Sequence, residues 1–329
     1  MKPPWERWLP PSERWLPRGR MKGLSAALAS AVFLGLAPIF GKQAILAGFT
    51  PLAVVALRTG IAVLLLLVIM AIFQRPFFYI YPVGLVGCLL AGLINGLGSI
   101  LYYSGLSRLD ASIGQLIYSF YPLFFAFWLL LDRQPIHRIT LFRLLLAVPG
   151  IFLLVSTGSK PVDLPGALMM AGSAIFYALH LLINQRILYE VPAPTVTLYT
   201  LISMSATVLL AYLIFDRSLP ASGTTYIPVL GLAAITFFSR ITLFLGVKHL
   251  GGMQTAIIGL AELLVTVFSA VLWLGDTLSS LQWLGGICLA ISLILVGFDR
   301  TTPEKRRTTG WLSWLNPPQI QPPEIHWHS

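Results

Sequence analysis

Apolar residues in this chain come in long runs that short polar segments interrupt. A helix of about 20 apolar residues can cross the hydrocarbon core of a bilayer, which is about 30 Å thick. Ten runs approach this length, and the breaks between them carry turn residues and charges, as in Gln74–Pro76 and Ser156–Asp163. We therefore predict an all-α membrane protein with ten transmembrane helices. The runs cover residues 22–45, 51–73, 82–105, 111–131, 139–156, 164–186, 194–215, 226–247, 253–275 and 280–298.

The composition excludes an ordinary soluble domain. Hydrophobic residues make up 57% of the chain, charged residues make up 10%, and the mean hydropathy is +0.82, whereas soluble domains carry about 25% charged residues. The net charge of +10 would suggest nucleic-acid binding, but the basic residues gather at the ends of apolar runs, as membrane proteins have them. We expect the lipid bilayer, and no nucleic acid, as a partner. Cys88 and Cys288 both lie inside apolar runs, so no disulfide framework is predicted.

The distribution of lysine and arginine predicts the orientation. With the N-terminus inside, sixteen of the 22 basic residues fall on the cytoplasmic side, four fall on the outer side, and two fall within spans. This bias predicts a multi-pass protein of the plasma (inner) membrane with both termini in the cytoplasm. The first run is too long for a cleaved signal peptide. The outer residues are Lys42, Arg108, Lys160 and Arg217, and those within spans are Arg58 and Arg240.

Two basic tails rich in proline and tryptophan flank the apolar region, at residues 1–21 and 300–329. The sequence ERWLP occurs at Glu6–Pro10 and again at Glu13–Pro17. Such a segment cannot build a packed core, and we expect its tryptophans to rest on an anionic leaflet. A second hypothesis is that translation starts at Met21, because MKGLSAALAS opens directly on the first run.

The two halves of the apolar region are related to each other. Gly105–Phe127 aligns with Gly246–Phe268 at an offset of 141, and Ser30–Gly35 aligns with Ser173–Ala178 at an offset of 143. Each half would hold five spans, so the second half enters the membrane from the opposite side. Inverted repeats of this kind build many secondary transporters, with the substrate site near the midplane between the halves. The predicted repeats are residues 22–157 and 158–299.

Three stretches carry a family resemblance: Thr50–Leu67, Tyr102–Phe127 and Leu245–Asp276. The chain resembles members of the drug/metabolite transporter superfamily with EamA-type repeats, over roughly residues 22–298. The resemblance implies a ten-helix carrier for small metabolites, often amino acids or related solutes, that commonly works as an exporter.

The chain departs from the family pattern at one position of the second repeat. The family often reads Glu-Pro where this chain has Glu262-Leu263. Because the proline is absent, the resemblance does not imply a helix break at Glu262. The family also often closes that helix with an acid, and Asp132 and Asp276 are the closing acids here.

Glu262 is the one acidic residue deep within a predicted span, about ten residues or 15 Å from its start. A charge at the bilayer centre costs roughly 2.5–3.5 kcal/mol, so this side chain is expected to face the bundle interior and find a partner. One interpretation is a structural ion pair with Arg240 or Arg58. The other is that Glu262 lines a central cavity, where it holds substrate or a proton. The candidate substrate-binding residues are Glu262, Tyr118, Tyr121, Gln115, Asn95, His180 and Arg240, and the candidate structural or gating charges are Arg58 and Lys42.

The neutral candidates have alternative interpretations. Tyr118, Tyr121 and Gln115 share a helical face and could hydrogen-bond a polar solute, but ordinary helix packing would also explain them. Asn95 lies in a GxxxG segment that is typical of close helix contact. His180 fits a hydrogen-bonded packing residue as well as a ligand-binding one.

The sequence favours a carrier over an enzyme. It contains no phosphate-binding loop, no HExxH motif, no zinc-ligand spacing and no nucleophile elbow, so we expect no catalytic residue, cofactor or metal. Deep charges of both signs suit a small-molecule zwitterion such as an amino acid, moved by alternating access by a monomer or homodimer. Two alternatives are a drug or organic-cation exporter, with Glu262 as the cation site, and a membrane scaffold or sensor without transport.

Overall fold

The computed structural model of this chain is helical throughout the residues that it describes. These residues are 17–109, 111–134, 136, 138–155, 163–218, 220, 223–274, 280–295 and 310–315, so Asp276 and most of both predicted tails lie outside them. The α-helices are α1 (Pro17–Leu46), α2 (Pro51–Phe73), α3 (Pro82–Arg108), α4 (Ala111–Tyr118), α5 (Tyr121–Leu131), α6 (Arg138–Val155), α7 (Leu164–Ile187), α8 (Ala193–Phe215), α9 (Ile227–Leu250), α10 (Gly252–Gly259), α11 (Ala261–Leu274) and α12 (Ser280–Ile294), and the 3₁₀ turns are η2 (Arg75–Phe78) and η4 (Ser313–Leu315).

Six of these helices are long and apolar enough to cross a membrane: α1 from Met21, α2, α3, α7, α8 and α9. They coincide with six of the predicted runs, and the prediction of an all-α protein is confirmed. The run 139–156 forms α6 and the run 280–298 contains α12, which are shorter helices. The two remaining runs, 111–131 and 253–275, are each divided between two helices.

Helix starts follow local sequence signals. The Thr50 hydroxyl accepts a hydrogen bond from the Ala53 N–H at the start of α2, and the Asp163 carboxylate accepts one from the Gly166 N–H at the start of α7. A proline occupies the first or second position of both helices, where its missing N–H is not needed. At the end of α9, Gly251 has a φ of 87°, which ends the helix before α10 begins.

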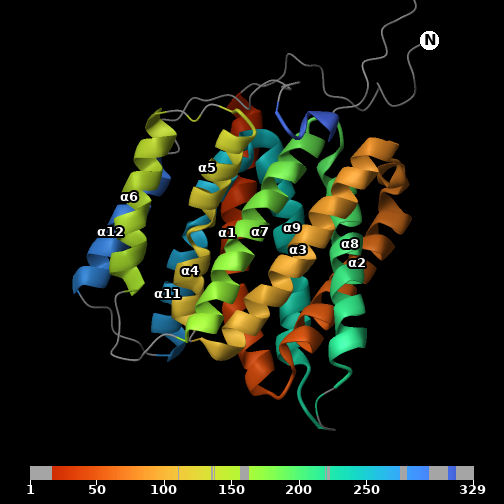
Figure 1. Cartoon of the computed structure of the whole chain (residues 1–329), viewed down its shortest axis with the longest axis horizontal. Coiled ribbons are helices and arrows are strands. Elements are labelled where there is room, and N and C mark those ends of the chain that lie inside the picture. Colours follow the sequence, from red (N-terminus) through yellow and green to blue (C-terminus); the bar gives the residue numbers. More distant parts are fainter. Residues whose placement is uncertain are drawn as a thin grey trace, which may run out of the picture.

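Two long helix pairs form the centre of the bundle (Figure 1). Helix α1 packs along α9, and α3 packs along α7. Each pair joins the first helix of one half to the third long helix of the other, the reciprocal arrangement expected of two inverted repeats. Helices α2 and α8 pack against these pairs on one side, while α6 and α12 lie side by side at the opposite edge.

The two divided runs meet in the middle of the bundle. The first is interrupted at Ser119 and Phe120, directly before Tyr121-Pro122, where the proline lacks the N–H that a continuous helix needs. The second is interrupted at Leu260, two residues before Glu262. The expectation of one helix across each run was therefore wrong.

The second interruption forms without a proline because Tyr121 stabilises it. The Leu260 N–H bonds to the Ile257 carbonyl at 3.1 Å rather than to the Ala256 carbonyl, its partner in a regular α-helix. The Tyr121 hydroxyl donates to the Ala256 carbonyl at 2.9 Å and satisfies it. Tyr121 and Glu262 are counterparts at the repeat offset of 141. A residue that directly follows the interruption in the first repeat therefore stabilises the interruption in the second.

A buried ion pair fastens the end of α5 to the end of α7. The Arg186 guanidinium contacts the Asp132 carboxylate at 2.5 Å, with both side chains almost fully buried. The same carboxylate accepts hydrogen bonds from the Gln134 amide at 2.6 Å and from the backbone N–H of Leu312 at 3.3 Å. Leu312 and Leu315 are buried whereas Trp311 and Trp314 are exposed, so the segment Gly310–Leu315 contributes its two leucines to the core beside the pair.

The helix interruption predicts that position 259 tolerates no side chain. A Cβ on Gly259 would collide with the Tyr121 hydroxyl, so Gly259→Ala should destabilise the protein by about 1–3 kcal/mol, the usual cost of overpacking. Gly60→Ala is the matched control, because the nearest atom to its Cβ would be the Ser205 hydroxyl at 3.9 Å. Thermal unfolding in detergent should show a lower melting temperature for Gly259→Ala alone. Equal melting temperatures would contradict this account of the interruption.

The buried ion pair predicts a second difference in stability. Asp132→Asn keeps the shape of the side chain but removes the negative charge that pairs with Arg186, and loss of one charge of a buried pair should cost about 3–5 kcal/mol of unfolding free energy. The control is Asp163→Asn, since Asp163 pairs with Arg108 at 3.6 Å with both side chains well exposed, and such pairs contribute about 1 kcal/mol or less. Denaturant or thermal unfolding measures both, and similar losses in the two variants would sink the distinction.

Candidate functional site

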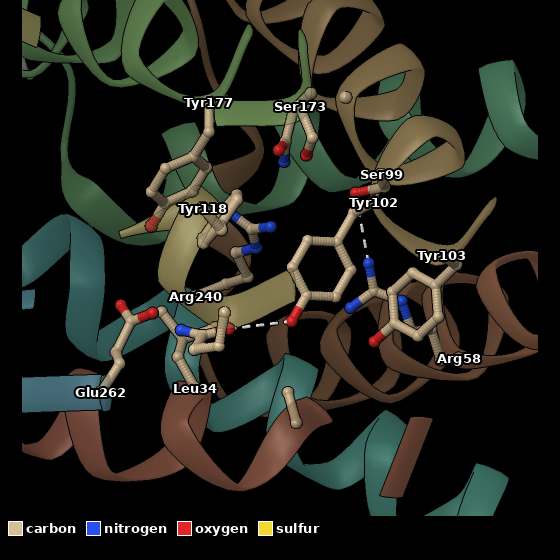
Figure 2. A pocket seen from close by; sticks show the side chains of 14 residues that line it. Leu34, Arg58, Ser99, Tyr102, Tyr103, Tyr118, Ser173, Tyr177, Arg240 and Glu262 are labelled. Atoms are coloured by element: carbon tan, nitrogen blue, oxygen red, sulfur yellow. Dashed lines mark hydrogen bonds between the residues drawn. The ribbon is translucent and has the colours of Figure 1, made fainter. Parts of the chain in front are cut away.

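A cavity opens where the two helix pairs face the interrupted helices (Figure 2). The empty space among its lining side chains, including the part open to the surroundings, is about 500 Å³. Helices α1, α2, α3, α4, α7, α9 and α11 contribute its walls. The lining residues are Leu34, Ala37, Arg58, Asn95, Gly98, Ser99, Tyr102, Tyr103, Gln115, Tyr118, Ser173, Tyr177, Arg240 and Glu262.

The cavity gathers five of the seven candidate substrate-binding residues. They come from four separate elements, α3, α4, α9 and α11, and they are Glu262, Tyr118, Gln115, Asn95 and Arg240. Arg58, a candidate structural or gating charge, also lines the cavity. Tyr121, His180 and Lys42 are not among the lining residues.

Glu262 reaches the cavity from the first turn of α11. The helix interruption exposes backbone N–H groups at this point, and the positive end of the helix dipole favours a carboxylate there. Glu262 is buried, and in the same cavity wall the Gln115 side-chain oxygen accepts a hydrogen bond from the Tyr102 hydroxyl at 3.0 Å. In Figure 2 the dashed line that ends at the Tyr102 hydroxyl marks this bond, and the other dashed line joins Arg58 to Ser99. The interruption thus turns the acid toward the cavity.

The Glu262–arginine ion pair, one of the two interpretations of this acid, is not formed among the described residues. Within the part of the chain that the structure describes, the ion pairs are Arg108–Asp163 and Arg186–Asp132. Figure 2 shows Arg240 nearer to Glu262 and Arg58 on the other side of the Tyr102 ring. The carboxylate is therefore free of a direct cationic partner in this conformation.

Both arginines are held by neutral groups. Arg58 donates to the Thr236 hydroxyl and to the Ser99 hydroxyl, each at 3.2 Å, and its guanidinium lies 4.7 Å from the centre of the Tyr103 ring. Arg240 lies 5.9 Å from the centre of the Tyr177 ring. The rings stabilise the cations without neutralising their charge.

Several N–H groups of these arginines have no partner. Nε of Arg58 and both Nε and Nη1 of Arg240 are buried without a hydrogen bond. Buried donors of this kind are costly to leave unsatisfied, and a ligand acceptor would satisfy them. The cavity therefore has the donors to bind a polar, charged solute.

The remaining candidates have structural positions. The His180 ring bonds to the Ala91 carbonyl through Nδ1 at 3.0 Å and packs against Phe244. Lys42 donates to the carbonyls of Leu106 and Leu109 at 2.9 and 3.0 Å, at the end of α3.

Sequence reasoning missed much of the cavity wall. Tyr102, Tyr103, Tyr177, Ser99 and Ser173 were not candidates, although they line it. The repeat offset holds a signal for one of them, because Ser99 is the counterpart of Arg240 at an offset of 141. The tyrosines carry no such signal, since tyrosine is common in apolar helices for packing reasons.

The arrangement suits the binding of a polar solute. Its walls offer guanidinium, carboxylate, amide and phenol groups, with aromatic rings that can cover apolar parts of a solute. Among the described residues, no three His, Cys, Asp or Glu side chains lie close enough to hold a metal ion.

Known proteins share this sequence pattern and fold. The model of the EamA-like transporter family matches residues 21–156 and again 164–298. The uncharacterized transporter YcbK of Bacillus subtilis (strain 168) is 24% identical over 218 residues, which cover 62% of this chain and 68% of YcbK. A protein crystal structure matches with a TM-score of 0.66 at 18% identity, covering 85% of this chain and 96% of its own. With two matched repeats that span most of its length, the chain belongs to the EamA-like transporter family.

Proposed function

We propose that this protein is a secondary transporter that exports small, amino-acid-like polar solutes by alternating access between two inverted repeats. Membership of a transporter family supports membrane transport of small solutes. The observation that carries the finer proposal is the buried cavity, where Glu262, Arg58 and Arg240 bring charges of both signs together. A zwitterion could pair with both signs at once, whereas a lipophilic cation would meet two buried arginines.

The proposed topology has ten spans. Helices α4 with α5, and α10 with α11, each make one interrupted span, and α6 and α12 make two shorter ones. Interrupted spans are tolerated in membranes where they line a cavity, as these do. The lysine and arginine distribution supports cytoplasmic termini in the inner membrane.

Two polar contacts are suitable gates for alternating access. Lys42 of α1 binds the carbonyls at the end of α3, and the Gln185 side-chain oxygen of α7 accepts a hydrogen bond from the Gly252 N–H of α10 at 3.0 Å. Lys42 and Gln185 are counterparts at the repeat offset of 143. Each contact joins the α1–α9 side of the bundle to the α3–α7 side, so rocking one side against the other would open one contact at a time.

The cavity predicts ligand-dependent stabilisation of the purified protein. A bound solute at about 100 times its Kd should stabilise the fold by about 2.7 kcal/mol. We expect an amino acid to produce this shift in thermal unfolding, and Glu262→Gln to abolish it. Asp216→Asn, which changes an acid just outside α8, should keep the full shift. A shift that persists in Glu262→Gln would show that Glu262 does not hold the solute.

The gate contacts predict a change in accessibility. In a variant without native cysteines (Cys88→Ala, Cys288→Ala), the cavity residue Ser173 is replaced by cysteine and labelled with a membrane-impermeant thiol reagent from outside the cell. Lys42→Met removes the donor but keeps an apolar stem, so labelling should accelerate several-fold. Arg217→Met, in an exposed segment after α8, serves as the control. Unchanged labelling in Lys42→Met would remove Lys42 from the gate.

A further inference from the structure

We propose that the transported solute carries two acidic groups and one ammonium group, as a small acidic amino acid does. This inference rests on the proposed transport function and narrows its substrate class. It follows from the number, the separation and the unmet hydrogen bonds of the charged side chains in the cavity.

The cavity wall is not electrically balanced. Among the described lining residues, two guanidinium groups face one carboxylate, and the other side chains are neutral. The formal charge of the wall is therefore positive by one unit. A neutral zwitterion leaves this excess in place, whereas a solute with a net charge of −1 removes it. Charge balance matters here because an unpaired charge costs more free energy when it is buried away from water.

The two arginines are held separately. Arg58 is fixed by Thr236 and Ser99 and lies against the Tyr103 ring, while Arg240 lies against the Tyr177 ring. Figure 2 shows the Tyr102 ring between the two guanidinium groups. Each arginine has at least one buried N–H without a partner. A carboxylate is the natural acceptor for such a planar cation, so two separate arginines favour two acidic groups.

Glu262 provides the position for the ammonium group. Among the described residues, its carboxylate forms no ion pair with either arginine. A dicarboxylate without an amino group would bring two negative charges next to the Glu262 carboxylate, and that carboxylate would repel it. The three charges therefore match an amino dicarboxylate better than an anion without an amino group.

Three solutes of nearly equal size test this match. L-Glutamate has two acidic groups and one ammonium group, L-glutamine has one acidic group replaced by a neutral amide, and glutarate lacks the ammonium group. Purified protein in liposomes loaded with each unlabelled solute is assayed for counterflow of the same radiolabelled solute. We expect glutamate counterflow to exceed that of glutamine and of glutarate by at least tenfold.

Two variants report on the separate positions. Arg240→Gln should lower the preference for glutamate over glutamine to near unity, while Arg240→Lys should keep part of it because the charge remains. Glu262→Gln should raise glutarate counterflow relative to glutamate. The comparison of the three solutes on the unmodified protein needs no variant, so a poorly folding substitution leaves the test intact.

The outcomes separate this inference from the proposed function. Glutamine counterflow that equals or exceeds glutamate counterflow would overturn the two-acid inference and leave amino-acid transport standing. Glutarate counterflow that matches glutamate would remove the role of the ammonium group. Absence of counterflow for these solutes and for a panel of neutral amino acids and lipophilic cations would overturn the transport function itself, and the inference with it.

Discussion

The architecture depends on satisfying backbone polar groups where helices are interrupted deep in the bundle. At that depth no water is expected to replace a missing helix hydrogen bond, so each interruption needs a partner from the protein. Tyr121 provides that partner through its bond to the Ala256 carbonyl. This bond joins one interrupted helix to the other. The cavity wall, the orientation of Glu262 and the contact between the repeats therefore all depend on it.

The sequence predicted the helices because their signals are local. Runs of apolar residues, prolines at helix starts and a glycine after α9 all act within one element, and the structure has helices where they occur. The interruption before Glu262 has no local signal, since its cause is a tyrosine 135 residues away that binds the Ala256 carbonyl. Tertiary contacts of this kind override local propensity and are invisible in the sequence.

The cavity was predicted in part, and for a physical reason. Buried charge is expensive, so Glu262 and Arg240 stood out in an apolar sequence and do line the cavity. The tyrosines that complete the wall cost little free energy to bury, so they did not stand out in the sequence. The repeats also differ where chemistry is concerned: Ser99 corresponds to Arg240, and Tyr121 corresponds to Glu262. The two repeats thus place different side chains at equivalent positions, and these differing positions would recognise the solute.

The segment Gly310–Leu315, which buries Leu312 and Leu315, has a consequence for biosynthesis. Leu312 and Leu315 fill core positions against the ends of α3 and α7, and Leu312 contributes a hydrogen bond to the Asp132 carboxylate. The ribosome makes these residues after α12, so the core is completed only once the segment that follows the bundle has been made. A chain that stops after α12 would leave an uncovered ion pair and an apolar surface at one end, and in cells such a loss of stability lowers abundance through chaperones and proteases.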